Sequence, residues 1–286
     1  RSYTIPPNII DEICLLCLSF DIDARHGGLA ALGALARVIK FDQEQMHPLL
    51  NLGDDFQVDN IRCAHIGFLA GLVGQGIQIS DFEQTLSALL VKGTPVVQQA
   101  VVEAIEYVNE SNQVISTSFY EELLSKTGSP GVILAFSAFP QSFLGDHVEQ
   151  LTATFNQILD SKQETIDSKV AIMKTCSKLH NIFEFESLHQ LILKGMNNRT
   201  ITNKGDEGSD VRCAALRCII SVGIGDRLID DILRLAFDRI TGVRVLAIQA
   251  LREAKPQNAT LNRIIQERVV NVSTFSPLID DEEYAL

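Results

Sequence analysis

One apolar pattern returns along the chain about every 36 residues, and it constrains the fold more than any other feature. In its clearest copy the apolar residues stand at 211, 214, 215, 218, 219 and 222, which is the spacing of one face of an α-helix. Copies start at 24, 61, 97, 132, 168, 211 and 243, so successive starts are 37, 36, 35, 36, 43 and 32 residues apart. A period of this size predicts stacked repeats, each a small unit of secondary structure.

Three positions of the repeated pattern carry a characteristic side chain. The fourth position is small in six copies, which lets a neighbouring helix approach closely; these residues are Gly27, Ala64, Ala100, Ala135, Ala171 and Ala214. The second position is basic in five copies: Arg25, Arg62, Lys169, Arg212 and Arg244. Two residues before it, four copies have a residue suited to a helix N-cap: Asp23, Asn60, Asp167 and Asp210. We expect the four arginines to be structural ladder residues that face the acidic cap of an adjacent repeat.

A second set of apolar helical stripes lies between the copies of the pattern. These partner segments are 8–20, 42–52, 80–91, 116–125, 146–159, 184–197 and 226–240. The second helix of a HEAT repeat typically shows this pattern at this period. It begins with an acidic residue, followed by Val or Ile, a basic residue and a small residue. The sequence therefore predicts an all-α fold, a HEAT/armadillo-type α-α superhelical solenoid of about seven helix pairs.

We expect one continuous solenoid over residues 1–272, because each repeat packs only on its neighbours. A closing helix at 257–270 would cover the last apolar face, and 273–286 would form an acidic flexible tail. The predicted repeats are approximately 6–40, 42–76, 79–110, 115–143, 144–181, 184–224 and 225–255.

Charge and composition exclude several classes of protein. The chain has 24 basic and 36 acidic residues, a net charge of −12, which argues against a nucleic-acid binder and against binding to an acidic membrane surface. No run of 18 apolar residues suggests a membrane span. The start has neither the apolar core of a signal peptide nor an initiator Met, so we expect a fragment or processed piece. Six scattered cysteines indicate reduced thiols of a cytosolic protein.

No group of residues in the sequence supports catalysis, a metal site or a bound cofactor. Cys14 and Cys17 form a CxxC pair, but it lies inside an apolar helix and we interpret it as buried packing rather than a redox or zinc site. His65 occupies an apolar position and is expected in the core. His26, next to Arg25, is a candidate for partner binding, although structural packing is the favoured interpretation. No phosphate-binding or nucleophile motif is present, so we expect no enzyme.

The longest spacing between copies results from a polar segment at 197–209. Insertions in solenoids often lie on one face and bind partners, and a tolerated surface loop is the equal alternative. We take Arg199, Lys204, Asp206 and Glu207 as partner-binding candidates, together with His26. Joint replacement of the last three loop residues is expected to weaken partner binding without loss of helicity.

Three stretches of the chain resemble the tubulin-folding cofactor D family. Residues 204–216 (KGDEGSDVRCAAL) resemble its Arg-Gly-Asp-x-Gly-x-Trp-Val-Arg-x-Ala-Ala segment, with Asp210 where the family usually has Trp. Residues 18–27 (LSFDIDARHG) resemble its Leu-Ser-x-Asp-x-x-x-Arg-His-Gly stretch, and residues 135–144 (AFSAFPQSFL) resemble its Ala-Leu-Gly-Ala-Leu-Pro-x-Phe-Leu run. The family protein is longer on both sides, so the chain resembles its middle HEAT-repeat region, over roughly residues 11–225.

The resemblance implies a tubulin-specific chaperone that binds β-tubulin and assembles the αβ-tubulin heterodimer with cofactors C and E. It also implies an Arf-like small GTPase as a partner and a cytoplasmic location with microtubule or centrosome association. GTP chemistry would belong to tubulin and the GTPase. The alternative is another HEAT-repeat interaction scaffold, such as a transport receptor, an adaptor or a phosphatase scaffold.

Overall fold

The computed structural model describes residues 5–50, 52, 58–111, 113 and 115–254. The expected closing helix at 257–270 and the acidic tail at 273–286 lie outside these residues. The chain divides into two compact units, Arg1–Phe143 and Leu144–Leu286. Within the described ranges the secondary structure is helical, apart from one isolated bridge between Thr202 and Gly205.

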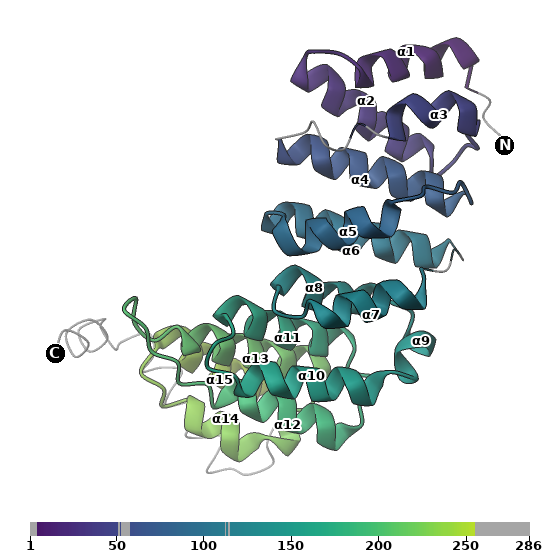
Figure 1. The fold of residues 1–286 in the computed structure, drawn as a ribbon. Helices are drawn as coiled ribbons and strands as arrows, with labels where there is room; N and C mark the ends of the chain where they lie inside the picture. Colours follow the sequence, from purple (N-terminus) through teal and green to yellow (C-terminus); the bar gives the residue numbers. More distant parts are fainter. Residues whose placement is uncertain (1–4, 51, 53–57, 112, 114, 255–286) are drawn as a thin grey trace. The chain divides into compact units, whose positions relative to one another are not determined.

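Unit 1 consists of four helix pairs (Figure 1). Its first helices are α1 (Pro7–Cys17), α3 (Gln43–Leu50), α5 (Phe82–Lys92) and α7 (Thr117–Ser125). Its second helices are α2 (Ile22–Leu35), α4 (Asp59–Gly74), α6 (Pro95–Glu110) and α8 (Pro130–Ala135). A 3₁₀ turn, η2 (Phe136–Ala138), and the short α9 (Gln141–Gly145) follow. The second helices pack in succession, α2 on α4, α4 on α6 and α6 on α8.

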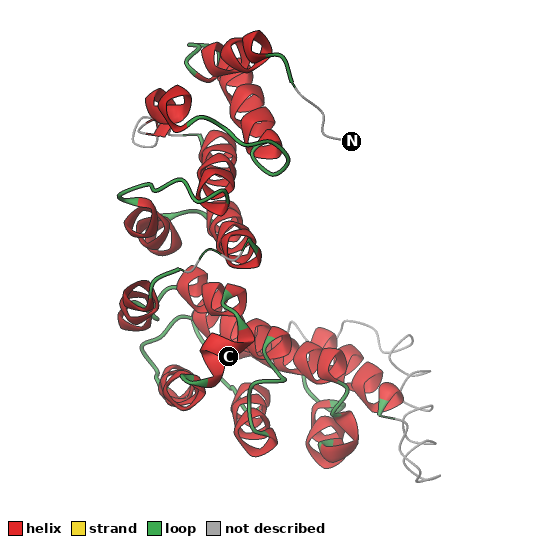
Figure 2. Ribbon diagram, turned by 90° about the vertical axis from the view of Figure 1, so that its right-hand side faces the viewer, coloured by secondary structure: helices red, strands yellow, loops and turns green. Residues whose placement is uncertain are grey.

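Unit 2 repeats the arrangement with three pairs. Its first helices are α10 (Val148–Asp160), α12 (Phe185–Met196) and α14 (Ile229–Leu235). Its second helices are α11 (Ile166–Lys178), α13 (Gly208–Val222) and α15 (Thr241–Glu253), and the 3₁₀ turn η3 (Gly225–Arg227) precedes α14. Here α11 contacts α13 and α13 contacts α15, while α10 contacts α12 and α12 contacts α14. Figure 2 shows the two rows of helices in each unit, so the predicted HEAT-type stack of helix pairs is confirmed.

The repeated apolar pattern stands in a constant position at the start of the second helices. Six of its copies begin two residues after the first residue of the helix, and the copy at 211 begins three after it. The N-cap prediction for Asp23, Asn60, Asp167 and Asp210 is therefore wrong, since these residues lie inside the first turn. Asp21 caps α2 instead, and its carboxylate accepts the N–H of Asp23 at 2.9 Å. The acidic residues in the first turn still favour the helix by interacting with its dipole.

α8 is the shortest second helix, and a proline explains why the helical conformation stops after the 3₁₀ turn η2 that follows it. Pro140 disfavours a helical conformation in the residue before it, and Phe139 accordingly is extended, with φ −78° and ψ 149°. The chain closes this end of unit 1 with aromatic rings. Tyr120 meets Phe136, Phe139 and Phe143 edge-on, with ring centroids 5.5, 5.6 and 5.2 Å apart. Edge-to-face pairs of this kind are favourable beyond the area they bury.

The closest approach of α2 and α4 depends on glycines that the sequence analysis did not single out. A Cβ on Gly71 would stand 2.5 Å from the Cβ of Ala36, and one on Gly33 would stand 3.2 Å from the backbone nitrogen of Phe68. Gly27, which the repeated pattern predicted as the small contact residue, has nothing within 4 Å of such an atom. The expectation of close contact is therefore wrong for Gly27, because the helices meet about two turns further along.

We predict that Gly71→Ala destabilises unit 1 by about 1 to 3 kcal/mol, because overpacking forces backbone shifts. Gly67→Ala is the matched control, since it lies in the same helix with open space at its Cβ position. That control should be neutral or stabilising by up to about 1 kcal/mol, the helix-propensity gain of Ala over Gly. Urea denaturation followed by circular dichroism measures both, and equal midpoints for the two variants would contradict the packing account.

Candidate protein-interaction site

A long side chain at the second position of the repeated pattern ties down the turn before each of several second helices. It donates to a backbone carbonyl near the end of the preceding first helix, where helices leave carbonyls without partners. We call this contact the turn clamp. The donor–acceptor pairs are Arg25 to Ser19, Gln98 to Leu90, Lys169 to Ser161, Arg212 to Asn198, and Arg244 to Asp238 and Arg239.

The four arginines predicted as ladder residues make different contacts. Arg25 and Arg244 each donate to carbonyls of their own repeat, as the turn clamp describes, and Arg244 also donates to the Thr241 hydroxyl. Arg62 lies 3.6 Å from Asp59 in its own helix. Arg212 reaches into the following repeat, where its Nε and Nη2 lie 3.0 Å from the carboxylate oxygens of Asp238. Arg212 thus joins two repeats.

The loop between α12 and α13 has a defined conformation. Thr202 and Gly205 exchange two backbone hydrogen bonds of 2.9 and 3.1 Å, and Gly205 has φ +108°, which favours glycine. The Gly208 N–H donates to the Thr200 carbonyl at 2.9 Å, and the Asn198 side chain accepts the Thr200 N–H at 3.1 Å. These bonds hold the polar insertion as a compact turn on α13.

A buried ion cluster lies beneath this loop. The Arg212 side chain is 1% exposed, and the side chains of its partners Asp206 and Asp238 are 9% and 4% exposed. The Nη2 of Arg212 donates to Asp206 at 2.8 Å, and Arg199 lies 3.0 Å from the second Asp238 oxygen. Two arginines and two aspartates therefore neutralise one another, which a buried charge requires.

The cluster holds Asp238 in its charged form. Burial alone would raise the pKa of this carboxyl, but the Ile240 N–H, Arg212 and Arg199 together lower it below its ordinary value. The Ile240 N–H donates to Asp238 at 3.0 Å. Hydrogen bonds and positive charges that favour the carboxylate thus outweigh desolvation.

The cluster also forms the floor of a cavity of about 500 Å³ in unit 2. Its rim carries Arg234 and Arg239, which are exposed, and two apolar side chains, Ile201 at 63% and Phe237 at 54% exposed. We name this the arginine cavity. It is lined by Arg199, Ile201, Asp206, Arg212, Arg234, Phe237, Asp238 and Arg239.

The predicted contact residues of the loop occupy different environments. Lys204 is 80% exposed at its side chain and lies 4.0 Å from Glu207, which is partly exposed. Arg199 is half exposed and Asp206 is buried against Arg212. Joint replacement of Lys204, Asp206 and Glu207 would therefore remove one carboxylate of the cluster, so it does not isolate a surface effect.

His26 is exposed on α2 and belongs to unit 1. His65 is buried as predicted, its Nε2 lies 3.1 Å from the Leu49 carbonyl oxygen, and burial lowers its pKa. Cys17 is also buried, and burial raises the pKa of its thiol to about 12, while Cys14 is half buried. A thiol with such a pKa is a poor nucleophile and a poor metal ligand.

The sequence analysis missed Asp238, Ile201 and Phe237. Asp238 and Phe237 fall in a segment predicted as helix to residue 240, whereas α14 ends at Leu235. No local sequence signal identified Asp238, because its pairing with Arg212 joins two different repeats. Ile201 is the one strongly apolar residue within the polar insertion.

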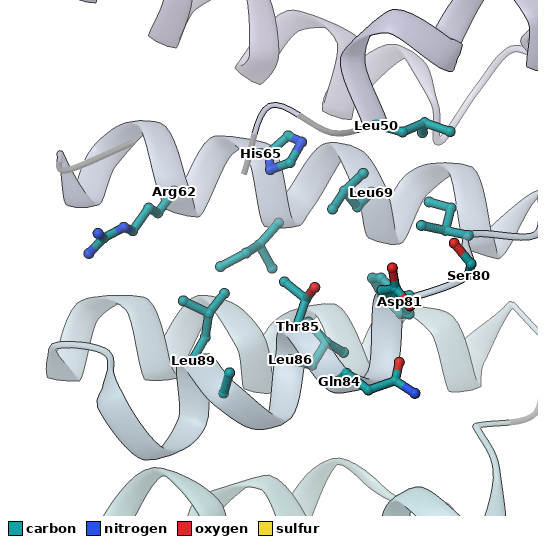
Figure 3. Close-up of a pocket in the computed structure, with 14 residues that line it drawn as sticks. Leu50, Arg62, His65, Leu69, Ser80, Asp81, Gln84, Thr85, Leu86 and Leu89 are labelled. Carbon is teal, nitrogen blue, oxygen red and sulfur yellow. The ribbon is translucent and has the colours of Figure 1, made fainter. Parts of the chain in front are cut away.

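A second cavity, of about 560 Å³, lies in unit 1 between α4 and α5. Figure 3 shows Arg62, His65 and Leu69 from α4 together with Thr85 and Leu89 from α5 around it. Leu50 closes one side. The lining is mixed, with one arginine and one aspartate, Asp81, so it has no excess of charge that would select a partner.

Within the described part of the chain, no three His, Cys, Asp or Glu side chains are grouped so that they could hold a metal ion. The same residues contain no helix with the length and apolar character needed to cross a bilayer.

Comparison with known proteins gives one similar fold. No protein-family model matches the chain, and no curated protein matches it. Among solved structures, the chain is similar to the Mot1 N-terminal domain in its crystal structure in complex with TBP, with 18% identity and a TM-score of 0.47. The match covers 91% of this chain and 36% of that chain, so this chain spans about a third of its length. A likeness of this size assigns neither partner nor activity.

We predict that Arg212→Met destabilises unit 2 by about 3 to 5 kcal/mol, because it leaves Asp206 and Asp238 buried without their shared cation. Arg217→Gln is the matched control on the same helix, where the arginine is exposed, and it should change stability by less than about 0.5 kcal/mol. Urea denaturation measures both. A midpoint for Arg212→Met equal to that of the control would show that the cluster does not hold the loop.

We predict that the stabilising effect of Asp238 depends on pH in one direction. Its pKa is lowered in the folded state, so its contribution is complete above the unfolded pKa of about 3.9 and is lost as the pH falls through the folded pKa. The stability difference between the wild type and Asp238→Asn should therefore be largest near pH 7 and shrink below about pH 4. Denaturation midpoints of both proteins at pH 7, 5, 4 and 3 test this, and a difference that grows toward acid would refute it.

Proposed function

We propose that this chain is the protein-binding scaffold of a tubulin assembly chaperone of the cofactor D type, which holds β-tubulin through the 198–209 loop and the surface beside it. The observation that carries the proposal concerns two of the family-like stretches, residues 18–27 and 204–216. Each forms a turn that side-chain hydrogen bonds hold in place before a second helix. The resemblance therefore concerns residues with a defined structural task.

The first stretch, residues 18–27, shapes the turn between α1 and α2. The Ser19 hydroxyl accepts the Asp21 N–H at 3.1 Å, and Asp21 caps α2. Arg25 donates from Nε and Nη2 to the Ser19 carbonyl at 2.9 and 2.6 Å. The Ser, Asp and Arg of the family-like pattern thus act together, and the turn leaves Phe20 and His26 exposed.

The second stretch, residues 204–216, shapes the loop before α13. Gly205 takes the positive φ that the turn requires. A Cβ on Gly208 would stand 2.7 Å from the Thr200 nitrogen, and Asp206 pairs with Arg212. The Gly-Asp-x-Gly and Val-Arg elements of the pattern are therefore those that set the loop geometry. The match at these residues supports the proposal that the loop has the same conformation as in the family. Asp210, where the family usually has Trp, is exposed and changes the surface.

The chain acts in this proposal by holding a partner. Exposed side chains at the loop, among them Lys204 and Ile201, meet the partner, while the buried cluster keeps the loop rigid so that little ordering entropy is lost on binding. Cofactors C and E and an Arf-like GTPase would join the same complex. GTP hydrolysis would take place on tubulin and the GTPase.

We predict that the immobilised chain captures β-tubulin from cell extract and that Lys204→Ala with Glu207→Ala weakens the capture about tenfold, equivalent to about 1.4 kcal/mol. Lys174→Ala with Glu149→Ala is the control, because both residues are exposed in the same unit and the charge change is the same. Captured proteins are identified by mass spectrometry, and circular dichroism checks that helicity is unchanged.

Each outcome of this capture experiment decides one point. Equal capture by the loop variant and the control variant would remove the loop from the proposal. Capture of cargo proteins, clathrin or phosphatase subunits in place of tubulin would favour a HEAT scaffold of another class and overturn the tubulin proposal.

A further inference from the structure

The cavity of about 560 Å³ in unit 1 is an elongated space along two helices. α4 lines it with Arg62, Ile66 and Leu69, and α5 lines it with Thr85 and Leu89. Residues three or four apart share one face of a helix, so each helix presents about two turns, roughly 10 Å, to the cavity. Figure 3 shows α4 and α5 along opposite sides of it. We name this cavity the α4–α5 groove.

The groove has an apolar floor and a mouth that opens to solvent. Ile66 and Leu86 are buried in the floor, whereas Gln84 and Ala88 are exposed at the mouth. Apolar side chains on the walls are partly exposed, namely Leu50, Ile79 and Leu89. An apolar stripe with polar borders is the kind of surface on which the apolar face of an amphipathic helix docks.

The position of the groove in the stack is one that a first helix covers in other repeats. In unit 1 α5 packs on α7, and in unit 2 α10 packs on α12 and α12 on α14. Such contacts close the space between a second helix and the first helix that follows it. α3 has only eight residues, against eleven in α5, and among the described residues it lines the groove with Leu50 alone. The shape that fits the groove is therefore that of a helix.

The two ends of the groove carry opposite charges, which cancel in sum but define a direction. Figure 3 shows Arg62 at one end and Asp81 at the other. The Arg62 guanidinium lies 3.6 Å from Asp59, beyond hydrogen-bonding distance, and Asp81 is exposed at the start of α5. A helix carries partial positive charge at its N-terminus and partial negative charge at its C-terminus. A docked helix is therefore favoured with its N-terminus beside Asp81.

We propose that the α4–α5 groove binds an amphipathic α-helix of a partner protein, with about two turns in contact and large aliphatic side chains at positions i, i+3 and i+7. These side chains pack on Leu50, Ile79 and Leu89. The N-terminus of the bound helix lies beside Asp81 and its C-terminus beside Arg62. The groove belongs to unit 1 and the loop of the proposed function to unit 2, so this inference does not rest on tubulin binding.

The binding test uses the full chain and a fluorescein-labelled peptide of twelve residues, held helical by a hydrocarbon staple between its fourth and eighth residues. Leucine stands at its third, sixth and tenth positions, and the other residues are polar. A control peptide of the same composition has leucine at its second, fifth and eleventh positions, so that the leucines no longer share a face. Fluorescence polarisation should show binding of the first peptide and at least tenfold weaker binding of the control.

Two matched variants and a cross-linking measurement locate the site. Ala88→Trp places a large ring in the mouth of the groove and should weaken binding of the first peptide at least tenfold. Ala30→Trp makes the same change at an exposed position of α2 in the same unit and should keep the affinity within twofold. Circular dichroism checks that both variants keep their helicity. A photoreactive group on the last peptide residue should cross-link the wild type around Arg62 and Leu89, which decides the site independently of the variants.

Several results would overturn the proposal. They are no binding of the first peptide at 1 mM, equal binding of the two peptides, and equal binding of the first peptide by the two variants. Cross-links from the last peptide residue to the segment around Asp81 contradict the direction of the bound helix, and cross-links confined to unit 2 contradict its place. Either pattern of cross-links overturns the proposal as well.

Discussion

In five of the seven described helix pairs, a long side chain at the start of the second helix donates a hydrogen bond to a carbonyl at or just after the end of the first helix. A helix pair can stack only if its turn is held, because free carbonyls at a helix end must otherwise find water or a new partner. Arg25, Gln98, Lys169, Arg212 and Arg244 all make this turn clamp. The same position can hold Arg, Lys or Gln because each reaches the carbonyl with an N–H donor.

Arg212 shows how a shared structural contact becomes the base of a specialised surface. It keeps the clamp to the Asn198 carbonyl, at 2.7 Å, and in addition pairs with Asp206 and Asp238. Those two carboxylates come from the turns before α13 and α15, so one guanidinium fixes two successive turns. The cluster also holds the longer insertion at 197–209, because Arg212 bonds to Asn198 at its start and to Asp206 near its end. One buried arginine therefore both bonds the loop and lines the cavity beside it.

The helix pairs could be predicted from sequence because the signals for them are local. Apolar spacing within one helix depends on neighbours three and four residues away, and it located the second helices to within two or three residues of their starts. Contacts between different helices and loops were harder to predict from the sequence. Nothing near Gly71 in sequence shows that Ala36 approaches it, and the polar composition of the loop concealed that Asp206 is buried. Such features depend on which carbonyl or cation a side chain meets in another repeat.

The buried cluster and the exposed rim of the arginine cavity differ in their structural roles. The cluster holds the loop backbone, and the rim side chains face solvent. The side chains of Asp206 and Arg212 are almost fully enclosed and, together with Gly208, hold the loop backbone. Ile201, Arg234 and Phe237 beside them are exposed, and Arg234 also donates to the Asn197 side chain at 3.1 Å, next to the clamp acceptor Asn198. A chain can therefore share the cluster with a family and differ at the rim. The clamp and the buried cluster fix the backbone of the loop, and the exposed side chains at the rim can change without removing those contacts.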